Sequence, residues 1–211
     1  MSDAPRDVNM QLEPFHVVFI CTGNRARSAL AEASLRAKTD RDAVRVESYG
    51  TLQRGPGQQR GAEPALPEAI AAAAALGLDL NGHRARSLDR VRLDDADLVI
   101  GFESFHIAAA VVDAGARRER SFLLRELVEL FNALPRIDGA SDLARARSVV
   151  AHADELRGGK RGSALSLADP YGGSKRVFEE TAATIDSLTS VVARRLSRAS
   201  RPEHTHGPGA A

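Results

Sequence analysis

Short apolar runs alternate with helical patterns along most of this chain. Runs rich in valine, isoleucine, leucine and phenylalanine predict four strands, at residues 16–20, 44–49, 98–102 and 121–124. Apolar residues that recur every three or four positions predict helices at residues 28–37, 67–76, 105–114, 125–133, 141–157 and 174–197. Strands separated by helices pair in parallel through right-handed crossovers. The sequence therefore predicts an α/β fold with a four-stranded parallel sheet and helices on both of its faces.

The length of the chain fits a single domain of this kind. Of its 211 residues 43% are hydrophobic, which is enough for one α/β core and too little for two ordinary domains. We expect residues 15–198 to form this domain. Residues 1–14 are polar and predict a flexible N-terminal segment, and residues 199–211, rich in proline, glycine and histidine, predict a disordered tail.

The junction between the first predicted strand and the first predicted helix has a distinctive composition. It consists of Cys21, Thr22, Gly23, Asn24, Arg25, Ala26, Arg27 and Ser28. Glycine and asparagine tolerate the positive φ that a tight loop requires. Backbone N–H groups of a loop that wraps over a helix start point inward and bind anions, and the helix dipole adds to this attraction. The junction therefore predicts a phosphate-binding loop, or P-loop.

Cys21 and Arg27 are the residues that would carry chemistry in such a loop. The field at a helix N-terminus favours the thiolate, which is the nucleophilic form of cysteine. The Arg27 guanidinium can hold two phosphoryl oxygens at once, and the Ser28 hydroxyl can donate to the sulfur. Taken alone, a cysteine at the end of a buried strand is commonly an inert small hydrophobe. The complete order of strand, cysteine, Gly-Asn, Arg-Ser and helix favours a nucleophile.

A phosphoryl transfer also needs an acid that protonates the leaving oxygen. The candidate is Asp169, in a turn marked by Pro170, Gly172 and Gly173 before the last predicted helix. We expect partial burial and an approaching phosphate dianion to favour its protonated form. The alternative is that this Asp-Pro sequence is only a turn or a helix cap.

The loop at residues 21–28 and the sequence Asp169-Pro170-Tyr171 together resemble the low-molecular-weight protein tyrosine phosphatase family. In this family the loop lies near the N-terminus and the acid lies in an Asp-Pro-Tyr turn near the C-terminus, whereas the larger tyrosine phosphatases place the acid before the loop. Further matches are Ala31-Glu32, Ser48-Tyr49-Gly50-Thr51, His83-Arg84-Ala85-Arg86, Asp97-Leu98-Val99-Ile100 and Glu103-Ser104. The resemblance covers most of residues 15–198.

The resemblance implies a role for each matched residue. Cys21 would attack phosphorus and form a cysteinyl-phosphate, Arg27 would bind the phosphoryl oxygens, and Asp169 would act as general acid and then as base. It also implies that Asn24, Ser48 and His83 form a hydrogen-bond network that holds the loop in shape, and that Tyr171 lies at the rim of the pocket. For His83, a surface or helix-capping role is an equal alternative.

Three features depart from the family pattern. Ala26 stands where many members have a second cysteine, and the chain has no other cysteine, so an internal disulfide cannot protect Cys21. Arg25 stands where tyrosine phosphatases usually have an apolar residue and a phosphoarginine-specific branch has threonine. It would either select anionic substrates or point to solvent. Residues 139–166 look longer than the usual link to the acid and predict an insertion.

Charge and cysteine content limit the partners of this chain. With 29 basic and 28 acidic residues its net charge is +1, which gives no case for nucleic acid or a membrane surface. No apolar run of about 18 residues occurs and a lone thiol suits the cytoplasm, where we expect the protein to act. The expected partner is a phosphorylated protein or a small phosphomonoester. We expect no cofactor and no metal, and the sequence does not determine the oligomeric state.

Three functions are compatible with these residues. The first is hydrolysis of phosphotyrosine in proteins, with phosphoarginine as an alternative substrate. The second is arsenate reduction with a small external thiol, which needs Cys21 and Arg27 but no leaving-group acid. The third is a silent phosphate-binding module, which the presence of nucleophile, arginine and acid disfavours. The Gly-Asn pair and Asp169 favour the phosphatase.

Overall fold

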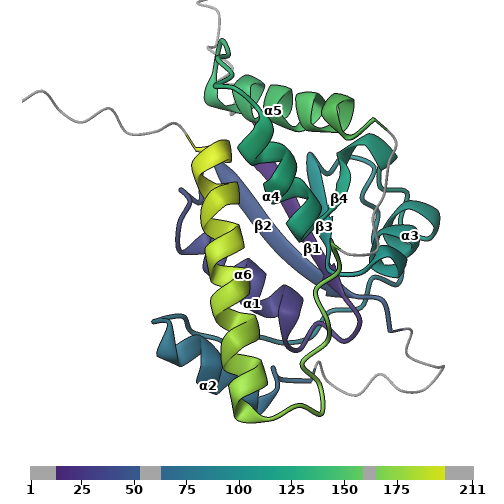
Figure 1. Ribbon diagram of the computed structural model, residues 1–211. Helices are drawn as coiled ribbons and strands as arrows, with labels where there is room; N and C mark the ends of the chain where they lie inside the picture. Colours follow the sequence, from purple (N-terminus) through teal and green to yellow (C-terminus); the bar gives the residue numbers. More distant parts are fainter. Residues whose placement is uncertain (1–12, 53–62, 159–164, 198–211) are drawn as a thin grey trace, which may run out of the picture.

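A parallel four-stranded sheet lies at the centre of the molecule (Figure 1). The computed structural model describes residues 13–52, 63–158 and 165–197. The strands are β1 (Phe15–Cys21), β2 (Val44–Gly50), β3 (Leu98–Gly101) and β4 (Ser121–Leu123), in the spatial order β2-β1-β3-β4. All three pairings are parallel, which confirms the predicted fold class.

Helices follow or precede every strand, as the alternating pattern predicts. They are α1 (Arg27–Arg36), α2 (Pro67–Ala75), α3 (Ser104–Val112), α4 (Leu124–Ala133), α5 (Asp142–Arg157) and α6 (Lys175–Leu196), with a short 3₁₀ turn, η1, at Arg118–Arg120. The predicted boundaries differ from these by at most two residues. For example, β3 ends at Gly101 rather than at 102, because the Phe102 N–H points to the ring of His106 instead of a neighbouring strand.

The two faces of β1 belong to two separate apolar clusters. Val17 and Phe19 pack into the larger cluster, which includes side chains of α1, α2, α4, α5 and α6. Val18 and Ile20 pack into the smaller cluster, which includes α3. Figure 1 shows α6 lying along α1 on the side of the larger cluster. A strand that is apolar on both faces is typical of a central parallel strand covered by helices.

The register of the sheet brings the carboxyl ends of the strands to one edge. Cys21 is the partner of Gly50, and Gly101 is the partner of both Ile20 and Leu123. Loops that follow parallel strands therefore meet at this edge, which is the usual place for a binding site in an open α/β sheet. The loop at residues 21–28 lies at this edge.

The segment predicted as an insertion contains α5, which is tied to the sheet through Arg157. This arginine is 6% exposed, and its guanidinium lies 4.1 Å from the ring centre of Phe122 in β4. It donates to the Ser121 carbonyl at 2.7 Å and to the Arg118 carbonyl at 3.2 Å, and it pairs with Asp154. Helix α5 is thus an integral part of the packed domain.

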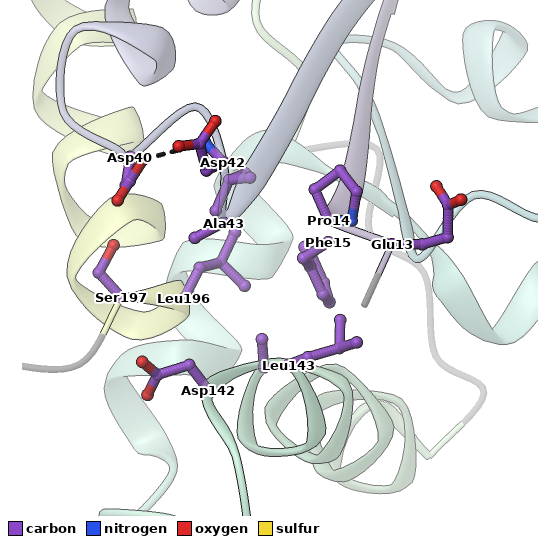
Figure 2. A pocket seen from close by; sticks show the side chains of 12 residues that line it. Glu13, Pro14, Phe15, Asp40, Asp42, Ala43, Asp142, Leu143, Leu196 and Ser197 are labelled. Atoms are coloured by element: carbon purple, nitrogen blue, oxygen red, sulfur yellow. Dashed lines mark hydrogen bonds between the residues drawn. The ribbon is translucent and has the colours of Figure 1, made fainter. Parts of the chain in front are cut away.

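A cavity of about 330 Å³ lies at the opposite edge of the sheet, beside the first residues of β1 and β2. Figure 2 shows the carboxylates of Glu13, Asp40, Asp42 and Asp142 around an apolar floor that includes Phe15. Four carboxylates repel a phosphate ester, so this cavity is a poorer site for an anion than the edge of the sheet at Cys21.

Two predicted segments, the N-terminal one up to residue 12 and the tail, lie outside the described residues.

Candidate active site

Cys21 is the last residue of β1 and lies under the loop that follows it. The residue is 3% exposed. Its Sγ atom lies 2.9 Å from the Ser28 hydroxyl and accepts a hydrogen bond from the Asn24 N–H at 3.2 Å. Both contacts suit an ionised sulfur, which accepts hydrogen bonds and is the nucleophilic form. The predicted contact between Ser28 and Cys21 is present.

Asn24 holds the loop in its turn. Its φ is 53°, in the left-handed region where asparagine is tolerated. Its buried side-chain amide donates to Ser28 Oγ at 2.8 Å and to Ser48 Oγ at 2.7 Å, and its Oδ1 accepts from the Arg86 N–H at 2.7 Å. These bonds satisfy the buried amide on both sides and offset the cost of the unusual backbone angle.

His83 supports the same loop from outside. Its Nε2 lies 2.7 Å from the Asn24 carbonyl, and because a carbonyl only accepts, the ring carries its hydrogen on Nε2. Burial lowers the pKa of His83 more than the Asn24 carbonyl raises it. The predicted network of Asn24, Ser48 and His83 is therefore present as a set of contacts, and His83 is not simply a surface or capping residue.

A buried glutamate extends this network into α1. Glu32 is 5% exposed. It accepts a hydrogen bond from the Ser48 hydroxyl and is bound by Arg86 at 2.9 Å and Arg36 at 2.8 Å. Two arginines thus compensate one buried carboxylate, as burial of a charge requires. Gly50 completes the packing, since a Cβ atom there would lie 2.8 Å from the Thr22 carbonyl oxygen.

Arg27 begins α1 and connects the loop to two carboxylates. The residue is 1% exposed. Its Nη1 donates to Glu103 Oε1 at 2.5 Å and to the Leu167 carbonyl at 2.9 Å, and its Nη2 donates to Asp169 Oδ2 at 2.5 Å. These three acceptors fix the orientation of the planar guanidinium and of its N–H donors.

Asp169 lies beside the loop because it is bound to Arg27, from which it is separated by 142 positions of sequence. Its Oδ1 accepts from the Tyr171 N–H at 3.2 Å, which shapes the turn at Pro170. The segment is fixed to the sheet because the Leu167 N–H donates to the Phe102 carbonyl at 2.8 Å. The Asp169 side chain is 41% exposed, so the carboxyl is only partly buried, and it is paired with Arg27.

Comparison with known proteins identifies the family of this chain. Residues 16–135 match the model of a family described as low molecular weight phosphotyrosine protein phosphatase. The chain belongs to this family. This confirms the resemblance predicted from the loop and the Asp-Pro-Tyr turn.

Several curated relatives match nearly the whole chain. The low molecular weight protein-tyrosine phosphatase A of Mycobacterium tuberculosis is 31% identical, over 88% of this chain and 96% of that protein. A protein-arginine-phosphatase of Bacillus subtilis is 26% identical, over 86% and 97% respectively. Among solved structures, a low molecular weight protein tyrosine phosphatase from T. tengcongensis aligns with a TM-score of 0.57 at 25% identity, covering 84% of this chain and 97% of that one.

Two expected residues have distinct environments. The Arg25 side chain donates from Nε to the Pro64 carbonyl at 2.9 Å, and its Nη1 lies 3.5 Å from the Glu63 carboxylate. It is thus bound to the segment before α2, and the solvent-pointing alternative is wrong. Tyr171 is 74% exposed and lies outside the packed core, two positions after Asp169.

The described residues contain no cluster of three or more side chains suited to hold a metal ion.

Sequence reasoning missed four residues that contact the loop or its supporting network: Glu32, Arg86, Glu103 and His106. It matched the first three only as parts of motifs, without a role. The pattern Glu-x-x-His, which begins two residues after the end of β3, was an available signal, because the two residues of a reciprocal helix cap stand three positions apart. Glu103 and His106 form such a reciprocal cap at the start of α3.

Proposed function

We propose that this protein is a phosphomonoesterase that removes the phosphoryl group from phosphotyrosine in proteins. The observation that carries the proposal is one connected cluster. A buried cysteine lies under the loop at residues 21–28, and the arginine of that loop is bound directly to the aspartate of a distant turn. Nucleophile, oxyanion-binding group and acid are the parts that a two-step phosphoryl transfer needs.

In the first step, the Cys21 sulfur attacks phosphorus and the bond between phosphorus and the tyrosyl oxygen breaks. The Arg27 guanidinium and the loop N–H groups bind the oxygens on which negative charge is concentrated. Asp169 transfers its proton to the leaving oxygen. To do so it exchanges its contact with Arg27 for one with the substrate, while Glu103 and the Leu167 carbonyl keep Arg27 oriented.

In the second step, water attacks the phosphorus of the cysteinyl-phosphate. Asp169 takes a proton from that water, the bond between phosphorus and sulfur breaks, and inorganic phosphate leaves. The Ser28 hydroxyl, 2.9 Å from the sulfur, stabilises the departing thiolate. Only side chains and water take part. The single thiol suits the cytoplasm as the place of action.

Arg25 favours phosphotyrosine over phosphoarginine. A phosphoarginine side chain brings a guanidinium close to the transferred phosphoryl group. Arg25 adds a cation to the loop that the half-exposed Glu63 carboxylate, 3.5 Å away, compensates only in part, and like charges at short range repel. Tyr171 offers an exposed ring beside the acid, on which an aromatic substrate can stack.

The test compares hydrolysis of an aryl phosphate, a phosphotyrosine peptide and a phosphoarginine peptide with thiol-dependent reduction of arsenate. We expect hydrolysis of both aryl substrates and little of the other two reactions. Arg25→Thr is the matched variant and should raise phosphoarginine hydrolysis relative to phosphotyrosine. Strong arsenate reduction without hydrolysis would refute the phosphatase proposal, and preferential phosphoarginine hydrolysis by the unaltered protein would refute the proposed substrate.

A further inference from the structure

His106 is a buried histidine directly behind the phosphate-binding loop. It is the third residue of α3 and has no exposed surface. Gly101 makes its close approach to β3 possible, since a Cβ atom there would lie 3.0 Å from the His106 Cβ. The Phe105 ring covers it, with ring centres 4.1 Å apart. The proposed mechanism leaves this histidine without a task.

The hydrogen bonds of His106 determine which of its nitrogens carries hydrogen. Nδ1 accepts from the Glu103 N–H at 3.0 Å and from the Phe102 N–H at 3.3 Å, so it carries no hydrogen. Burial, and secondly the Arg27 charge, lower the pKa of His106 to about 3. The ring is therefore neutral with its hydrogen on Nε2, and this nitrogen lies 3.1 Å from Thr22 Oγ1.

Thr22 follows the nucleophile, and its hydroxyl oxygen faces two donors. One is the His106 Nε2–H. The other is Arg27 Nη2, at 3.4 Å. A hydroxyl oxygen has two accepting lone pairs and one hydrogen, so both lone pairs are occupied and the hydrogen points in a third direction. In the described part of the chain, the contacts of Thr22 Oγ1 are with these two donors.

We propose that His106 is a positioning residue. By donating to the Thr22 hydroxyl, it leaves that hydroxyl able only to donate a hydrogen bond to the phosphoryl group bound in the loop. The inference rests on the proposed function for the identity of the anion. A free threonine hydroxyl can rotate and accept instead of donate. With both lone pairs occupied by N–H donors, it presents only positive charge to the anion, as preorganised stabilisation requires. Helix α3 thus reaches the site twice, through Glu103 on Arg27 and through His106 on Thr22.

The test is a double-mutant cycle with Thr22→Val and His106→Gln. Valine keeps the shape of threonine without its hydroxyl, and glutamine keeps an acceptor for the helix cap. We expect Thr22→Val to lower kcat for an aryl phosphate by about tenfold or more, and His106→Gln by about threefold or more. Combined, the second substitution should add less than about a twofold effect, because it acts through the first. Thr22→Ser keeps the hydroxyl and should retain more activity than Thr22→Val. Thr184→Val in α6, where the hydroxyl donates to the Glu180 carbonyl, is the matched control and should leave kcat unchanged.

Two readouts separate positioning from a merely structural role. The ¹⁵N NMR shifts of His106 should show hydrogen on Nε2 and none on Nδ1 from pH 5 to pH 9. Titration with inorganic phosphate should show weaker binding to Thr22→Val than to Thr22→Ser. This titration needs no turnover, so it tests the inference even if the unaltered protein hydrolyses no phosphate ester. Full activity of Thr22→Val, additive effects in the cycle, or hydrogen on Nδ1 would each overturn the proposal.

Discussion

At the scale of the residue, the site depends on close backbone packing around the loop as much as on its reactive groups. Gly50, the β2 partner of Cys21, accepts a hydrogen bond from Leu88 and donates one to Arg86. A Cβ atom on it would meet the Thr22 oxygen at 2.8 Å and the Asn24 nitrogen at 3.0 Å. Both neighbours are backbone atoms of the loop, which cannot move without changing its shape.

We therefore expect Gly50→Ala to lower kcat/KM for an aryl phosphate by about 10²-fold, because small displacements of positioned groups cost about this much. Steady-state kinetics measure the loss. Gly82→Ala is the matched control, since a Cβ atom at Gly82 meets nothing within 4 Å. Equal activity of the two variants would show that the loop tolerates displacement by a methyl group at position 50, and would contradict this prediction.

At the scale of the element, the N-terminal cap of α3 includes an ionisable side chain, His106. The pKa of His106 is about 3 in the folded protein and about 6.5 in an unfolded chain. Between these values the unfolded chain binds one more proton than the folded protein, so stability falls as pH falls below about 6.5. Burial also lowers the pKa of His83, and this histidine acts in the same direction.

We expect His106 alone to reduce the free energy of unfolding by about 2 kcal/mol between pH 6.5 and pH 5, at about 1.4 kcal/mol per pH unit. Urea unfolding at a series of pH values measures this slope. The slope of His106→Gln should be smaller by the contribution of one proton. If both proteins show the same slope, His106 does not remain neutral in the folded protein.

The sequence predicts the helices and strands of this protein better than it predicts the contacts between distant side chains. The strand β1 and the helix α6 follow from apolar patterns over 7 and 22 residues, so local sequence determines them. The pairing of Arg27 with Asp169 could be inferred because a phosphoryl transfer needs both groups. The contacts of Arg27 with Glu103 and of Thr22 with His106 span 76 and 84 positions. They depend on how α3 packs behind the loop, which no local pattern determines.

The same distinction applies to the surroundings of Asp169. The sequence shows that Pro170 and two glycines form a turn there. It does not show that the Leu167 N–H donates to the Phe102 carbonyl, a contact that fixes the segment so that the partly exposed carboxyl of Asp169 lies against Arg27. Arg25 was left with two alternatives for a similar reason, because its partners Glu63 and Pro64 come from a distant segment.

At the scale of the whole molecule, α5 joins the part of the chain that holds Cys21 to the part that holds Asp169. Among the described residues, no helix is long and apolar enough to cross a membrane, and α5 packs on the domain through the buried Arg157. This arginine satisfies two backbone carbonyls and one carboxylate. Its removal would leave these acceptors without their donor.

We expect Arg157→Leu to lower the free energy of unfolding by about 3 kcal/mol and to leave kcat of the folded protein within about twofold. Urea unfolding and kinetics measure the two effects. Arg176→Leu is the control and should change stability by less than about 1 kcal/mol, because its ion pair with Glu180 lies at the surface. A large loss of kcat with unchanged stability would contradict a purely structural role of Arg157.

The central claim is that Cys21 accepts the phosphoryl group and Asp169 serves both steps. Rapid acid quench followed by peptide mass spectrometry, during hydrolysis of an activated aryl phosphate, tests it most directly. Asp169→Asn slows hydrolysis of the intermediate, so we predict the mass of one phosphoryl group on the peptide containing Cys21, and none when Cys21→Ala is added. Hydrolysis by Cys21→Ala at the normal rate, or turnover by Asp169→Asn without a phosphorylated Cys21 peptide, would contradict the account.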